Sequence, residues 1–256
     1  MMILTESYGN NSNVLFQNLH LAAFCRKYDV EFVNPFICKY SEIFPNLRKD
    51  TRSLRRFSNI ELKIRKLFSH NFGVNESHEK QQQWLLSRGN RKTWVRGWGF
   101  RSYKDTEEQR QSFRDFFTPI CNDKILSETD IIKKNGKVLS VHIRRGDYRT
   151  WNSGQYFYDD ATYSELIRKT MQCIQGIGTI QIFSNEEIDM AFFRMDGVNV
   201  VAPKGLWFED QWRMSLSDAI VGPPSTFSLW ASYIGSVPIW QVKSQIDDVT
   251  MVVANG

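Results

Sequence analysis

Short apolar runs and segments of helical spacing alternate regularly along the second half of the chain, after about residue 125. The apolar runs predict five strands, at 138–143, 179–183, 198–201, 218–221 and 237–241. The segments between them predict four helices, at 160–175, 186–193, 208–217 and 226–234. Strands that alternate with helices through short turns are typical of a parallel, doubly wound α/β sheet.

The first half of the chain begins with the same pattern and then becomes less regular. An apolar run at 2–5, a helical segment at 13–28 and a strand at 30–33 predict a β-loop-α-β start. A start of this kind brings a backbone loop to a nucleotide or a sugar. A further helix is expected at 106–117, whereas the stretch at 69–87 has no clear period.

Two halves with this pattern predict an α/β protein made of two Rossmann-like lobes that face a central cleft. We expect an N-terminal lobe of residues 1–125 and a C-terminal lobe of residues 126–256. The boundary is placed near residues 122–136, a polar stretch that includes Asn135-Gly136.

The composition is that of a folded soluble protein, with 41% hydrophobic and 24% charged residues. The formal net charge of +5 favours anionic partners such as a nucleotide sugar, a phospholipid surface or a nucleic acid.

The four cysteines are scattered and form no Cys-x-x-Cys pair, so we expect reduced thiols and no metal site. The chain start lacks the basic flank and apolar core of a signal peptide, and no apolar run approaches the roughly 20 residues of a spanning helix. We therefore expect a cytoplasmic location.

Two basic segments allow more than one interpretation. Residues 48–66 are rich in lysine and arginine with apolar residues between them, so part of this segment is expected to be an amphipathic helix. The ordinary interpretation is a solvated helix face, and the functional one is peripheral contact with the inner membrane face or with an acceptor. Residues 91–101 interleave basic and aromatic side chains. They can stack bases of a single-stranded nucleic acid, stack sugar rings, or form a strand and turn packed on the core.

The most informative run of the chain, His142-Ile143-Arg144-Arg145-Gly146-Asp147-Tyr148, directly follows an apolar strand. The strand therefore presents two guanidiniums, an imidazole and a carboxylate at its carboxyl end, where open α/β sheets bind ligands. Paired arginines suit a diphosphate, because each guanidinium fork can bind two phosphate oxygens. The alternative is a solvated turn held by a salt bridge between arginine and aspartate.

This run resembles the first motif of the α-1,2- and α-1,6-fucosyltransferase group. Companion segments follow in the expected order over nearly the whole chain. They resemble the opening loop and helix, the mid-chain aromatic segment, the strand-end motif and the C-terminal motif block of the bacterial α-1,2-fucosyltransferases: Asn13–Gln17, Gly97–Ser102, Phe183–Asn185, Glu209–Asp210 with Met214–Val221, and Ser225–Tyr233. Asn11-Ser12 and Pro223-Pro224 depart from the family pattern, and these departures bear on the acceptor and the donor sugar.

The resemblance implies a GT-B fold and an inverting transferase that moves fucose from GDP-fucose to a hydroxyl of an oligosaccharide or glycolipid acceptor, most simply in α-1,2 linkage. It implies no cofactor beyond the donor and no metal, and the sequence has no Asp-x-Asp pair to hold Mg²⁺. The C-terminal lobe would bind the nucleotide sugar and the N-terminal lobe the acceptor.

The same resemblance assigns roles within the motifs. Arg144 would clamp the diphosphate, and Arg145 would either share this contact or anchor the loop to a carboxylate. His142 and Asp210 would bind the guanine, and Ser184 belongs to the strand-end motif that joins the donor site. The start of the last helix would offer backbone N–H groups to the β-phosphate, from Ser225, Thr226 and Phe227.

The general base is left open by the sequence. Asp147 is the nearest motif carboxylate, although it can instead order the arginine loop; Asp159, Asp160 and Glu6 are the other candidates.

Two other functions are compatible with some of these sequence features: transfer from a different nucleotide sugar, and nucleic-acid binding through residues 91–101. We expect no nucleic-acid partner. The Arg-Gly-Asp tripeptide at 145–147 is weak evidence for adhesion, since such triplets arise by chance.

Overall fold

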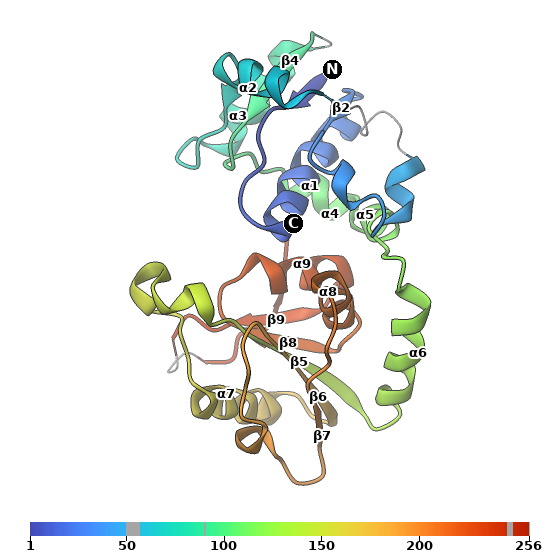
Figure 1. Cartoon of the computed structure of the whole chain (residues 1–256), viewed down its shortest axis with the longest axis vertical. Helices are drawn as coiled ribbons and strands as arrows, with labels where there is room; N and C mark the ends of the chain where they lie inside the picture. Colours follow the sequence, from blue (N-terminus) through green and yellow to red (C-terminus); the bar gives the residue numbers. More distant parts are fainter. Residues whose placement is uncertain (50–56, 90, 245–247, 256) are drawn as a thin grey trace. The chain divides into compact units, whose positions relative to one another are not determined.

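The computed structural model describes residues 1–49, 57–89, 91–244 and 248–255 (Figure 1). The chain divides into two compact units, Met1–Ile120 together with Asn255, and Cys121–Ala254. The stretch 122–136, expected to be a polar boundary, is mostly helix α6 (Asn122–Lys133). Ile125 and Thr129, one turn apart, are the buried residues of this helix, so its apolar signal was too short to detect.

The first unit is built on a parallel sheet of four short strands in the order β2-β1-β4-β3. The strands are β1 (Met2–Leu4), β2 (Phe32–Val33), β3 (His70–Asn71) and β4 (Thr93–Arg96). Helix α1 (Asn11–Lys27) follows β1 and is buried along most of its length, which confirms the β-loop-α-β start. Short 3₁₀ turns lie at Cys38–Tyr40 and Pro45–Lys49.

The remaining helices of the first unit differ from the predictions. The helix expected at 106–117 is two helices, α4 (Tyr103–Glu108) and α5 (Arg110–Phe116). They are separated at Gln109, whose side chain donates to the Ala23 carbonyl over 2.8 Å. Helix α3 (His78–Arg88) lies in the stretch where the sequence has no clear period. The period is weak because only Gln81 and Leu85 of this polar segment are buried.

The basic segment 48–66 is described in part. Helix α2 (Asn59–Leu67) occupies its end, as expected for an amphipathic helix, and Ser58 caps it by accepting from the Glu61 N–H. The predicted features at 50–56, with their three arginines, lie outside the described residues.

The second unit contains a six-stranded sheet in the order β10-β9-β8-β5-β6-β7. Five strands run parallel and confirm the predicted doubly wound sheet: β5 (Lys137–Ile143), β6 (Ile177–Ser184), β7 (Asn199–Val201), β8 (Ala219–Gly222) and β9 (Pro238–Gln241). Strand β10 (Val252–Val253) was not predicted and pairs antiparallel with β9.

Helices cover both faces of this sheet (Figure 1). They are α7 (Asp160–Cys173), α8 (Trp207–Ser215) and α9 (Thr226–Gly235), close to their predicted positions. Short 3₁₀ turns lie at Gly146–Arg149, Trp151–Gly154 and Met190–Phe193. The helix expected at 186–193 does not form; the 3₁₀ turn Met190–Phe193 is the only helical part of this segment.

Alternate residues of β5 point to opposite faces of the sheet, as strand geometry requires. Val141 and Ile143 belong to one core, which also contains the buried residues of α7. The other core holds Met214 of α8 with Ala231 of α9. Because both faces of the sheet are covered, every residue of β5 from Val138 to Ile143 is buried, including the polar Ser140 and His142.

The order of the strands creates a switch point beside β5. The chain builds outward from β5 through β6 to β7, then returns to the other side of β5 with β8 and β9. Strands β5 and β8 approach closely at their ends, because a Cβ on Gly222 would lie 2.7 Å from the His142 carbonyl oxygen. Ligands of open α/β sheets bind at the carboxyl ends of strands that flank such a point.

Candidate active site

The switch point of the second unit gathers most of the predicted site residues. His142, Arg144 and Arg145 lie at the carboxyl end of β5, and Ser184 is the last residue of the neighbouring β6. Ser225, Thr226 and Phe227 follow β8 on its other side and begin α9. Asp210 lies in the first turns of α8, which packs against α9.

Arg145 is an anchor within the protein. Its Nη2 atom lies 2.5 Å from Asp160 Oδ1 and its Nε donates to the Tyr158 carbonyl over 3.1 Å. The side chain is only 9% exposed, which leaves little of it accessible to a ligand. The second oxygen of Asp160 accepts from the Asp189 N–H, so this carboxylate is occupied on both sides. Of the two roles expected for Arg145, the structure shows the anchoring contact.

Arg144 is held differently, by a carboxylate three residues away. Its Nε lies 2.9 Å from Asp147 Oδ1, and its Nη2 donates to Asp147 Oδ2 over 3.1 Å. The Arg144 side chain is 25% exposed and that of Asp147 is 57% exposed. A surface pair of this kind contributes little to stability and can exchange partners. The fork of Arg144 is therefore oriented but still available to an anion.

The turn after these arginines is fixed by residues of the two motifs and by Glu186 and Arg149, which sequence reasoning did not select. Gly146 has a φ of 50°, and its N–H donates to Glu186 Oε1 over 2.9 Å. The other oxygen of Glu186 lies 2.7 Å from Arg149 Nη2, and this hydrogen bond lowers the pKa of Glu186. Asn185 accepts from the Arg145 N–H over 2.8 Å. Because Asn185 and Glu186 follow β6 directly, the position of the strand end was the signal available.

Ser184 contributes to the same turn. Its hydroxyl oxygen accepts from the Glu186 N–H over 3.2 Å, so it shapes the end of β6. Tyr148 closes the turn on the other side by donating its hydroxyl to the Pro224 carbonyl, just before α9. The β5 turn is therefore connected to the ends of both neighbouring strands.

His142 is buried at 4% exposure, and its ring centroid lies 5.1 Å from that of Phe227. Burial, with the nearby charge of Arg144, lowers the pKa of His142 to about 3, so the imidazole is neutral at physiological pH. Its Nδ1 atom has no hydrogen-bond partner among the described residues. A buried polar atom without a partner is unusual, and it leaves this ring nitrogen able to form a further hydrogen bond.

Asp210 presents a second unpaired polar atom. Its Oδ1 is buried without a hydrogen-bond partner in the described parts of the chain, and the nearest cation, Arg213 Nη1, is 4.0 Å away. Burial raises the pKa of Asp210 to about 6, although Arg213 opposes the shift. Arg213 itself pairs more closely with Glu128, at 2.8 Å. The negative charge of Asp210 therefore has no close ion-pair partner among the described residues, and its Oδ1 atom accepts no hydrogen bond there.

The start of α9 connects these groups. Ser225 is the N-cap, and its Oγ accepts from the Phe227 N–H over 3.2 Å. Gln211, which follows Asp210, donates to the Phe227 carbonyl over 2.9 Å and ties α8 to α9. The amino end of a helix carries partial positive charge, which favours a phosphate group nearby.

The carboxyl edge of the sheet in the first unit carries its own polar cluster. Glu6 follows β1, pairs with Lys66 of α2, and accepts from the Tyr8 hydroxyl over 2.5 Å. Burial alone would raise the pKa of Glu6, but the hydrogen bonds from Lys66 and Tyr8 outweigh it and lower the pKa. Glu6 is thus held as an ion within its own unit.

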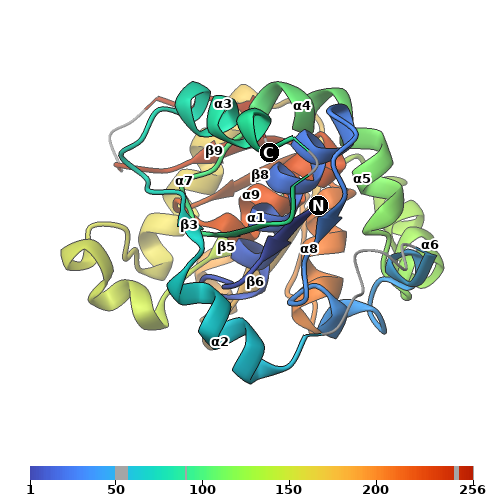
Figure 2. The ribbon, with the colours of Figure 1, turned by 90° about the horizontal axis from the view of Figure 1, so that it is seen from above.

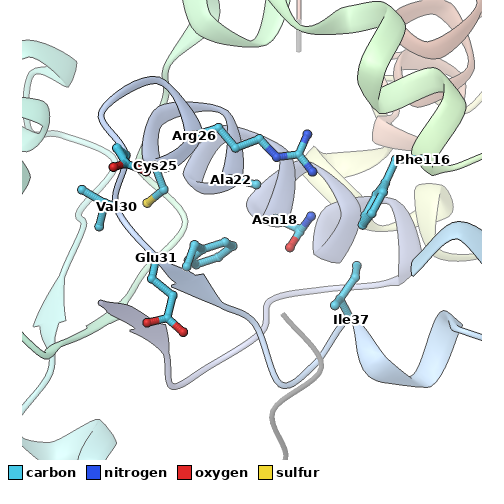
Figure 3. Close-up of a pocket in the computed structure, with 10 residues that line it drawn as sticks. Asn18, Ala22, Cys25, Arg26, Val30, Glu31, Ile37 and Phe116 are labelled. Atoms are coloured by element: carbon cyan, nitrogen blue, oxygen red, sulfur yellow. The ribbon is translucent and has the colours of Figure 1, made fainter. Parts of the chain in front are cut away.

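A hollow of about 350 Å³ lies elsewhere in the first unit (Figure 3). It is lined by the end of α1, including Cys25 and Arg26, and by Val30 and Glu31 before β2. Burial raises the pKa of the Cys25 thiol to about 12, so this sulfur is protonated and unreactive. The hollow lies at the amino end of β2 and contains none of the predicted site residues.

The described residues contain no group of three or more His, Cys, Asp or Glu side chains placed to hold a metal ion. The donor groups of the candidate site are instead an arginine fork, a helix start, an imidazole and a carboxylate. This set is suited to a nucleotide: cationic groups for phosphates, and a carboxylate that can accept from ring N–H groups.

Solved fucosyltransferase structures share this fold. NodZ alpha-1,6-fucosyltransferase soaked with GDP-fucose aligns with a TM-score of 0.55 at 13% identity, covering 98% of both chains. POFUT1 in complex with GDP-fucose aligns with a TM-score of 0.52 at 10% identity, covering 92% of this chain and 94% of that one. A mutant of Arabidopsis thaliana FUT1 in complex with GDP gives 0.50 at 7% identity, covering 94% and 70%. No family model and no curated protein matches the chain. At these identities the likeness establishes the fold.

Proposed function

We propose that this protein is an inverting fucosyltransferase that moves fucose from GDP-fucose to a hydroxyl of a glycan acceptor. The observation that carries the proposal is the pair of unpaired polar atoms, His142 Nδ1 and Asp210 Oδ1, together with the partly exposed fork of Arg144, two residues after His142. They occur at the switch point of a fold shared with proteins solved in complex with GDP-fucose.

Guanine binding would use the two unpaired atoms. The carboxylate of Asp210 can accept from the N1–H and the N2 amino group of guanine, which adenine and uracil do not present in this combination. Since the pKa of Asp210 is about 6, the carboxylate is mostly ionised at pH 7 and able to accept. The neutral imidazole of His142 would complete the pocket, with Phe227 against its ring.

Diphosphate binding would use Arg144 and the start of α9. As the bond between fucose C1 and the phosphate oxygen breaks, negative charge accumulates on the β-phosphate of GDP. A guanidinium fork and backbone N–H groups stabilise that charge more strongly in the transition state than in the ground state. Arg144 would then leave or share Asp147, while Arg145 keeps the turn in place through Asp160.

The acceptor hydroxyl attacks C1 from the face opposite GDP and loses its proton to a base. Asp147 is our candidate, because its carboxylate is more than half exposed at the motif turn, and release from Arg144 would free its oxygens. In this proposal Asp160 and Glu6 are set aside, since both are held by cations of their own units. The departing phosphate is the other proton acceptor available.

The finer points rest on the resemblance of the motifs. We propose α-1,2 linkage, a GT-B arrangement in which residues 126–256 bind the donor and residues 1–125 the acceptor, and GDP-fucose as the only small molecule required. A cytoplasmic location and an oligosaccharide or glycolipid acceptor are part of the same proposal.

The test compares nucleotides by thermal shift and donors by turnover. GDP at about 100 times its Kd should stabilise the fold by roughly 2.7 kcal/mol, and ADP and UDP far less. GDP-fucose alone should be hydrolysed slowly to GDP and fucose, and with a galactoside it should release GDP faster as fucose is transferred to the acceptor, whereas GDP-mannose should do neither. Equal stabilisation by all three diphosphates would refute the guanine assignment. Tight binding of single-stranded DNA with no response to GDP would favour a nucleic-acid protein instead.

A further inference from the structure

An apolar stripe lies on the exposed side of helix α2, where a helix of a soluble unit normally carries polar residues. Ile60, Ile64 and Leu67 are spaced at i, i+4 and i+7, which places them on one face. Their exposures are 72%, 53% and 79%, and Phe68 at the helix end is 80% exposed. Leu62, on the opposite side, is the buried residue of this helix.

Helix α2 is firmly attached in this orientation. Lys66 pairs with Glu6 at the edge of the sheet, and Leu62 is only 7% exposed. Figure 2 shows α2 at the periphery of the first unit, on the opposite side of its sheet from α3 and α4. The exposed stripe therefore results from how the helix is held, since the buried Leu62 and the ion pair of Lys66 fix its rotation.

Basic side chains surround the stripe. Lys63 lies on the same exposed helix, and Phe68 also lines a hollow of about 450 Å³ whose wall includes Arg88, Arg91 and Lys92. In the part of the chain that the structure describes, no carboxylate forms a salt bridge with any of these four cations. The Nε of Arg88 is buried in the hollow region without a hydrogen-bond partner among the described residues.

We propose that this α2 surface, the apolar stripe at 60–68 with its surrounding cations, docks the protein on an anionic lipid membrane. An interfacial helix places apolar side chains at the boundary between headgroups and acyl chains, with basic side chains against the phosphates. The α2 surface has both parts. The hollow beside Phe68 offers a lipid phosphate cations that lie over tryptophan rings, Arg88 over Trp84 and Lys92 over Trp94, and form no salt bridge with a described carboxylate. Charge complementarity selects an anionic lipid surface over a neutral protein partner.

The docking is peripheral. Over residues 1–49, 57–89, 91–244 and 248–255, no helix is long and apolar enough to cross a membrane. The proposal stands on the α2 surface alone and does not depend on the chemistry of the second unit. Together with that chemistry, it would bring the protein to the surface where lipid-linked glycans are found.

The test is flotation of the full chain with vesicles. Binding is expected to phosphatidylcholine vesicles that contain phosphatidylglycerol, and not to phosphatidylcholine alone. It should weaken strongly between 0.1 and 0.5 M salt, because the Debye length falls from about 10 Å to roughly half of that. The double variant Leu67→Ser with Phe68→Ser should lower the partition coefficient by about tenfold or more, since two large apolar side chains are lost. Lys92→Glu should lower it selectively on anionic vesicles.

The matched control is Ile131→Ser, which removes a 63% exposed apolar side chain from α6 in the second unit and should leave binding unchanged. Circular dichroism and the thermal midpoint should be the same for all variants, because every changed side chain is at the surface. Absence of binding to anionic vesicles, or equal binding by the Leu67 and Phe68 variant, overturns the proposal. So does a dimer in solution that the same variant dissociates, since the stripe would then join two copies of the chain.

Discussion

Replacing Asp210 by asparagine should make the empty protein more stable while weakening GDP binding. The Asp210 side chain is 22% exposed, its Oδ1 atom is buried without a hydrogen-bond partner among the described residues, and burial raises its pKa from 3.8 to about 6. Because the folded pKa lies above the ordinary value, the folded state binds the proton more tightly than the unfolded state. The stability from the protonated carboxyl is complete below about pH 4 and is lost as the pH rises through about 6.

The magnitude follows from that shift. A difference of about two pKa units corresponds to about 3 kcal/mol against the ionised form. The position of Asp210 near the amino end of α8 offsets this by up to about 1 kcal/mol through the helix dipole. We expect Asp210→Asn to gain about 2 kcal/mol at pH 7.5, or about 4 to 8 °C in the unfolding midpoint. At pH 4.5 the gain should fall to about 1 kcal/mol, because the folded carboxyl is then mostly protonated while the unfolded one is still mostly ionised.

The assay is thermal and urea unfolding of both proteins at pH 4.5 and 7.5, with and without GDP. Asp160→Asn is the matched control: it is the same chemical change at a carboxylate paired with Arg145 at 2.5 Å, and it should destabilise the protein. GDP should stabilise the Asp210 variant much less than the wild type. A loss of stability at pH 7.5, an equal gain at both pH values, or an unchanged GDP response would refute the reasoning.

Three further predictions separate the roles of the two adjacent arginines and the need for metal. Arg144→Lys should lower turnover roughly a hundredfold, because an ammonium cannot reproduce the fork, and should leave the unfolding midpoint nearly unchanged; near-normal turnover would make Arg144 structural. Arg145→Ala should instead lower the free energy of unfolding by about 3 to 5 kcal/mol in urea titrations, because Asp160 is left buried without its partner. A change below about 1 kcal/mol would contradict the anchoring role. Fucose transfer should survive EDTA, since the proposed site neutralises the diphosphate with cationic side chains, and loss restored by Mn²⁺ would contradict it.

The fold of the second unit was predictable because its strands are covered on both faces. Strand β6 is buried at most of its positions and every residue of β8 is buried, and their short length and flanking turns distinguish them from helices. The sequence did not predict two helices of the structure, α3 and α6, whose periodicity depends on two buried residues each. Helix α6 has two buried residues one turn apart, and α3 likewise, so neither produced a detectable period.

Side chains that bond to distant loops also defeated local prediction. The segment 186–193 was expected to be a helix, but Glu186 accepts from the Gly146 N–H and Asp189 donates its N–H to Asp160. Both contacts join residues about 30 to 40 positions apart in the sequence. Contacts of this range override helix propensity, and the chain keeps only the 3₁₀ turn Met190–Phe193.

The different environments of Arg144 and Arg145 could have been predicted from strand geometry. Side chains alternate between the two faces of a strand, so Arg145 shares the face of Ile143, and Arg144 shares the face of His142. Ile143 packs in the core with α7, and the partner of Arg145 is Asp160, the first residue of that helix. On the other face, Arg144 lies close enough to His142 to lower its pKa. Extending the two-residue period of β5 past its end therefore assigns one arginine to a structural contact and the other to the side where α9 begins.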